Sequence, residues 1–82
     1  MTATRQNIEG WLEEAKRLGA SHLIIAVDRF DYDNYPVYVG YNQDVNKEIK
    51  RIEGSSMQGI DEVYNMSKDI DEQLKQRRAW NL

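Results

Sequence analysis

The sequence predicts a small α+β domain in which a two-stranded antiparallel hairpin packs on three helices, in the order helix-strand-strand-helix-helix. Residues 4–18 and 44–74 carry apolar side chains at three- and four-residue spacing, which is typical of amphipathic helices, whereas residues 21–41 contain an apolar run and an alternating segment. The chain has 82 residues, 40% hydrophobic and 30% charged, which fits one folded domain over residues 1–82. The absence of cysteine excludes disulfide and thiolate-metal frameworks.

The first helix is expected between Thr4 and Leu18. Thr4 is a good N-cap residue, and Gly19 follows the last periodic residue, where a left-handed conformation often ends a helix. The positions that form its apolar stripe are Ile8, Trp11, Leu12, Ala15 and Leu18.

Two strands should follow. The run 23–27 is rich in branched side chains and too short for a typical helix, and residues 35–41 alternate between two faces. Pro36 is best tolerated at the start of a strand or on a sheet edge. The connection 30–34 is too short for a parallel crossover, so the two strands should form an antiparallel hairpin.

Two further helices are expected after the hairpin. Asp44 can cap a short helix that ends at Gly54, and Ser55 and Ser56 can cap a third helix running toward residue 80, with a bend or break at 65–69. The apolar positions assigned to this third helix are Met57, Ile60, Val63, Tyr64, Ile70 and Leu74.

Both faces of the first strand are apolar, and two strands alone are marginal in water. Either helices wrap both faces, or copies of the chain pack together through the hairpin. We expect a homo-oligomer.

The net charge of −3 resides entirely between Asp28 and Asp44, and the same window holds five of the eight aromatic residues. An acidic surface with tyrosines suits a basic protein partner and does not suit DNA. The alternative is that the aspartates cap turns and keep the hairpin soluble. We assign no metal, because Pro36 and Asn42 replace the glycine and glutamate of a calcium loop. The expected partner-binding residues are Asp28, Phe30, Asp31, Tyr32, Asp33, Tyr35, Tyr38 and Tyr41.

A second set of residues could bind phosphate or a nucleotide, with tyrosines stacking on the base. The same residues have simpler roles as helix caps and C-terminal cations, or in neutralising the acidic hairpin of a neighbouring subunit. His22 is the only histidine and no nucleophile motif accompanies it, so we expect neither an enzyme nor a cofactor. The phosphate set comprises Lys50, Arg51, Ser55, Ser56, Arg77, Arg78 and Trp80.

The segments 19–25 (GASHLII) and 30–39 (FDYDNYPVYV), with Trp11, Leu12 and 62–64, resemble a group of small phage and prophage proteins of unknown function. The resemblance implies a viral accessory protein that inhibits a bacterial immune effector by direct stoichiometric binding. Its alternatives are an oligomer that sequesters a cyclic or signalling nucleotide, and a structural or regulatory phage interaction protein. It implies no particular site residues. With no apolar run long enough to span a membrane, we expect a cytoplasmic protein without a membrane partner.

Overall fold

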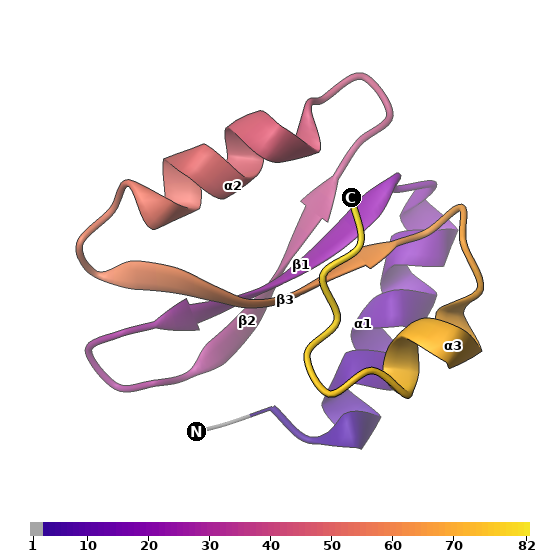
Figure 1. Cartoon of the computed structure of the whole chain (residues 1–82), viewed down its shortest axis with the longest axis horizontal. Helices are drawn as coiled ribbons and strands as arrows, with labels where there is room; N and C mark the ends of the chain where they lie inside the picture. Colours follow the sequence, from indigo (N-terminus) through magenta and orange to yellow (C-terminus); the bar gives the residue numbers. More distant parts are fainter. Residues whose placement is uncertain (1–2) are drawn as a thin grey trace.

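The computed structural model describes residues 3–82. Its elements follow one another in the order helix-strand-strand-helix-strand-helix (Figure 1). The α+β class is therefore confirmed, but the predicted third helix is wrong over residues 58–65, which form a strand, and only residues 70–74 of it are helical. The elements are α1 (Arg5–Leu18), β1 (His22–Asp28), β2 (Asn34–Val39), α2 (Val45–Glu53), β3 (Gln58–Asn65) and α3 (Ile70–Leu74).

The three strands form one antiparallel sheet in the order β2-β1-β3. The predicted hairpin is confirmed, since β1 and β2 pair along their length with Ile25 opposite Pro36. Pro36 lies on an edge strand, as expected for a residue that cannot donate a backbone hydrogen bond. The central strand β1 is hydrogen-bonded on both sides, which suits its almost wholly apolar sequence.

A β-bulge in β3 explains why this segment has the apolar spacing of a helix. Ile25 pairs with Glu62 whereas Ala26 pairs with Ile60, so Asp61 is an extra residue in the strand. The bulge shifts the alternation by one position, so that Ile60 and Val63 pack in the same core cluster although they are three residues apart. Three-residue spacing is also the signature of a helix, and this coincidence made the sequence-based assignment wrong.

Helices cover both faces of the sheet. Figure 1 shows α2 on one side and α1 with α3 on the other. The third strand and the two helical layers bury both faces of β1, so this burial does not require a second copy; the homo-oligomer stays a prediction. The core under α2 comprises Ile24, Ala26, Val39, Val45, Ile49, Ile52, Ile60 and Val63, and the core under α1 comprises Leu12, Ala15, Ala20, Leu23, Ile25, Tyr64 and Ala79.

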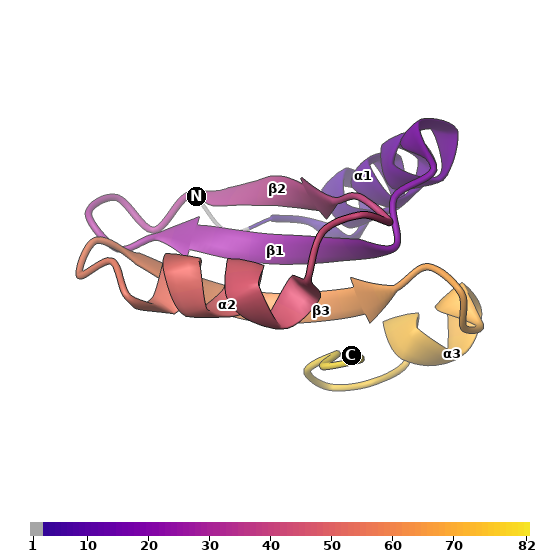
Figure 2. The same cartoon turned by 90° about the horizontal axis from the view of Figure 1, so that it is seen from above.

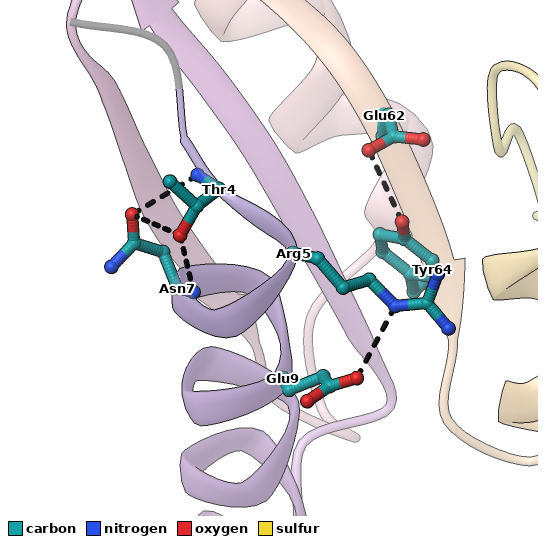
Figure 3. Close-up of polar contacts among 6 residues, drawn as sticks. All are labelled: Thr4, Arg5, Asn7, Glu9, Glu62 and Tyr64. Atoms are coloured by element: carbon teal, nitrogen blue, oxygen red, sulfur yellow. Dashed lines mark hydrogen bonds and ion pairs between the residues drawn. The ribbon is translucent and has the colours of Figure 1, made fainter.

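The helix ends confirm three predictions from the sequence. Thr4 caps α1 through a reciprocal pair of hydrogen bonds with Asn7 (Figure 3), and Gly19 ends the helix with a φ of 69°. Asp44 caps α2 by accepting a hydrogen bond from the backbone N–H of Asn46. These caps are local, which is why the sequence reveals them.

The last residues of the chain, 78–82, form a segment that we call the C-terminal tail. It runs along the outer edge of β3, where Trp80 forms a parallel bridge with Val63. Figure 2 shows the tail on the side of β3 that faces away from β1. The sheet therefore gains a short fourth partner at that edge.

Candidate binding surface at the hairpin tip

The connection between β1 and β2, residues 28–33, forms the hairpin tip and is built on aspartate turns. One carboxylate oxygen of Asp28 accepts a hydrogen bond of 2.8 Å from the N–H of Phe30, and one of Asp31 accepts a hydrogen bond of 3.2 Å from the N–H of Asp33. The N–H of Tyr32 donates to the carbonyl of Asp28. Two of the aspartates therefore stabilise turns, as the alternative interpretation held, and each retains a second carboxylate oxygen.

Tyr32 has a strained backbone conformation. Its φ is 61°, in the left-handed region that non-glycine residues adopt at a cost of roughly 1 kcal/mol. Among the non-glycine residues that the structure describes, it is the one with positive φ. Strained residues of this kind concentrate at functional sites.

The tip exposes a group of large apolar side chains. Phe30 is 80% exposed and Tyr32 is 68% exposed, far more than is usual for aromatic residues in a small domain. Met57 is 48% exposed, and its carbonyl accepts a hydrogen bond from the N–H of Arg29, which holds the start of β3 next to the tip. Two segments distant in the sequence thus place exposed apolar residues at the same end of the sheet.

A hollow of about 340 Å³ lies between the tip and β3. Arg29 packs flat against Gly59, so closely that a Cβ at Gly59 would lie 2.8 Å from the guanidinium nitrogens. The amide of Asn34 donates a hydrogen bond of 2.8 Å to the carboxylate of Asp61 across the hollow. Its lining residues are Val27, Arg29, Tyr32, Asn34, Ile60 and Asp61.

The remaining predicted tyrosines do not extend this surface. Tyr35 and Tyr38 are half-buried and pack against opposite faces of the sheet, and burial raises the pKa of each phenol. Tyr41 is 73% exposed but follows the far end of β2. The predicted acidic-aromatic set is therefore one patch at the tip and three separate tyrosines.

The predicted phosphate set is divided between two faces of the sheet. Lys50 and Arg51 lie on α2, where Arg51 pairs with Glu48 at 2.8 Å. Ser55 and Ser56 lie in the turn between α2 and β3, so they cap no helix, which corrects the prediction. Arg77, Arg78 and Trp80 follow α3; the two arginines line a hollow with Ile8 of α1, whereas Trp80 bridges Val63 at the edge of β3.

Arg77 and Arg78 do line a second hollow, of about 500 Å³, that shares Asn34 and Asp61 with the first. Asp61 and Glu62 line it as well, so its charge is mixed and does not favour a phosphate. The guanidinium of Arg78 donates to two backbone carbonyls and stacks on Trp80, with 5.0 Å between its carbon and the ring centroid. The predicted phosphate residues thus lie in separate places in a single copy of the chain.

Two polar side chains at the sheet have structural partners. His22 begins β1, at the opposite end of the strand from Asp28, and its Nε2 lies 2.9 Å from the carbonyl oxygen of Leu82. Tyr64 is buried and its hydroxyl donates to Glu62 at 3.1 Å (Figure 3). Burial, reinforced by the charge of Glu62, raises the pKa of Tyr64.

The sequence interpretation missed Met57 and Gly59 as neighbours of the tip, because both were assigned to a helix. Within residues 3–82 no three histidine, aspartate or glutamate side chains lie close enough to hold a metal ion. None of the helices in the same range is long and apolar enough to cross a lipid bilayer. Comparison of the chain with protein-family models, with curated proteins and with solved structures found no match.

Proposed function

We propose that this chain is a non-enzymatic binding domain that contacts a protein partner stoichiometrically through the hairpin tip. The observation that carries the proposal is the exposure of Phe30 and Tyr32 on one strained turn, which is hydrogen-bonded through the backbone of Arg29 to the exposed Met57. Aromatic side chains supply much of the binding energy in protein interfaces, and a patch that stays exposed in a small domain marks an interaction site.

The partner surface is basic around an apolar pocket. Asp31 and Asp33 are exposed and flank Tyr32, so their charges steer a cationic surface toward the aromatic side chains. The resemblance to small phage proteins suggests the class of partner, an effector of bacterial immunity in the cytoplasm of the host. The nucleotide alternative has less support, because its cationic residues lie on two faces of the sheet.

The test is affinity capture from a bacterial lysate with the full chain and with two tip variants, Phe30→Ser and Tyr32→Ser. A partner captured by the wild type should be lost at least tenfold with either variant. Tyr41→Ser is the matched control, because Tyr41 is as exposed as Tyr32 but lies at the far end of β2. Equal capture by the wild type and the tip variants would refute the proposal.

A charge test separates steering from packing. Asp31→Lys with Asp33→Lys should slow association with the purified partner several-fold and weaken its salt dependence, whereas Phe30→Ser should mainly accelerate dissociation. Surface plasmon resonance at two salt concentrations measures both rates. An unchanged association rate in the lysine variant would remove the basic partner from the proposal.

A further inference from the structure

The C-terminal tail pairs through its backbone with the outer edge of β3, in the same way that a peptide binds to a sheet edge. The N–H of Val63 donates to the carbonyl of Ala79 at 2.9 Å, and the N–H of Asn81 donates back to the carbonyl of Val63 at 3.0 Å. This pair of bonds is a parallel bridge centred on Trp80. Main-chain pairing of this kind is how sheet edges bind extended peptides.

The residues of the tail on either side of Trp80 make contacts that depend on their side chains, so the edge distinguishes one sequence from another. Arg78 donates from Nε to the carbonyl of Asp61 and from Nη2 to the carbonyl of Ile60, both at 2.9 Å. It thereby satisfies two carbonyls that face outward from the bulge. A lysine side chain could not replace it, because its single ammonium nitrogen cannot reproduce a contact made by two separate nitrogens of a planar group.

The next position accepts only a small side chain. Ala79 is completely buried in the core under α1, and its N–H donates to the carboxylate of Glu62 at 3.1 Å. The side-chain amide of Asn81 donates to the carbonyl of Val63 at 3.4 Å, and it also donates to Gln76 in the connection that precedes the tail. The edge therefore recognises an extended segment with arginine, alanine and asparagine at these three positions.

The tail is joined to the rest of the fold by a short exposed connection. Helix α3 ends at Leu74 and is anchored separately, because Gln73 bonds to both backbone groups of Asn65. The connecting residues 75–77 are exposed. Displacement of the tail thus leaves the anchor of α3 in place.

We propose that the outer edge of β3 binds the tail of a second copy of this chain in place of its own. Every copy carries the matching segment, and exchange between copies recreates the hydrogen bonds between the tail and β3, as in domain swapping. The exposed connection is the hinge. This inference concerns an edge that the proposed function does not use, so each can fail without the other.

The test uses a fluorescent peptide of residues 75–82 and the full-length chain carrying Arg78→Ala and Asn81→Ala. The peptide should bind this variant at least tenfold more tightly than it binds the wild type, whose own tail competes at a high effective concentration. The same peptide with Ala79→Leu should bind at least tenfold more weakly. Fluorescence anisotropy measures the affinities, and Phe30→Ser should leave them unchanged.

Equal binding of the two peptides to the tail variant would overturn the proposal. Should that variant not fold, as judged by circular dichroism, native mass spectrometry of the wild-type chain decides. Dimers should increase with protein concentration and decrease when the peptide is added in excess. A chain that remains monomeric at millimolar concentration would overturn the proposal as well.

Discussion

The two edges of the sheet avoid uncontrolled strand pairing in different ways. At β3 the carbonyls of Ile60 and Asp61 and both backbone groups of Val63 and Asn65 are bonded to other parts of the chain, namely Arg78, the tail and Gln73. At β2 a donor is missing instead. The N–H of Asp28 donates to Asp33, so alternate residues of β2 face β1 and Pro36 faces outward with no N–H to offer.

Uncovering the two edges should therefore have different consequences, because an exposed β3 edge lowers stability and an exposed β2 edge promotes self-association. At β3, removal of a covering group leaves polar backbone atoms beside a packed core, so stability falls. At β2, replacement of the proline adds a donor that water can satisfy, so association rather than stability should change. Three substitutions test this difference, from the largest expected effect to the smallest.

The largest effect is expected from Gln73→Ala. The Gln73 side chain is buried, accepts from the N–H of Asn65 and donates to its carbonyl, both at 2.8 Å. Loss of both partners should lower the free energy of unfolding in urea by about 3 kcal/mol. The exposed neighbour Glu72→Gln serves as the control, with a change below about 0.5 kcal/mol. A Gln73→Ala chain as stable as this control would show that the β3 edge does not need its cover.

Arg78→Ala should have an intermediate effect. The side chain is exposed, so water can replace its two hydrogen bonds, and we expect a loss of about 1 kcal/mol. Arg78→Lys should recover less than half of the loss, because an ammonium group cannot reproduce the two-pronged contact. Thermal unfolding of the three chains measures the order of their stabilities. Full recovery of stability in Arg78→Lys would show that the positive charge is sufficient and that the two-pronged contact is not needed.

Pro36→Val should change stability least. The free energy of unfolding should fall by less than about 1 kcal/mol, mainly because the unfolded chain becomes more flexible. Self-association, measured by sedimentation velocity, should increase through the restored N–H. Pro36→Lys restores the same donor with a charge, and it should stay dispersed. If both variants remain as dispersed as the wild type, the proline does not protect this edge.

The sequence predicts the parts of the fold that depend on neighbouring residues. Helix α1 with its Thr4 and Gly19 ends, the Asp44 cap and the β1–β2 hairpin all follow from spacing and turn chemistry over a few positions. The edge location of Pro36 follows from its missing donor. Each of these features is a property of one segment.

The candidate site was predicted only in part for the same reason. The turn 28–33 is local, so its exposed Phe30 and Tyr32 are visible in the sequence. Alternation alone does not tell which side of a strand a helix covers, so the sequence predicts Tyr35 and Tyr38 as partner-binding residues, although both pack on core clusters. Met57 joins the tip only through pairing of β3 with β1.

Local pattern and turn chemistry specify a helix, a hairpin and an acidic aromatic loop, because the interactions that stabilise them span few residues. Tertiary structure alone makes residues 58–65 a strand, since the bulge at Asp61 is defined by long-range pairing with β1 and gives the strand the spacing of a helix. It also buries Ala79 against that strand. Backbone groups at a sheet edge must find partners wherever the chain brings them, and no short segment of sequence contains that information.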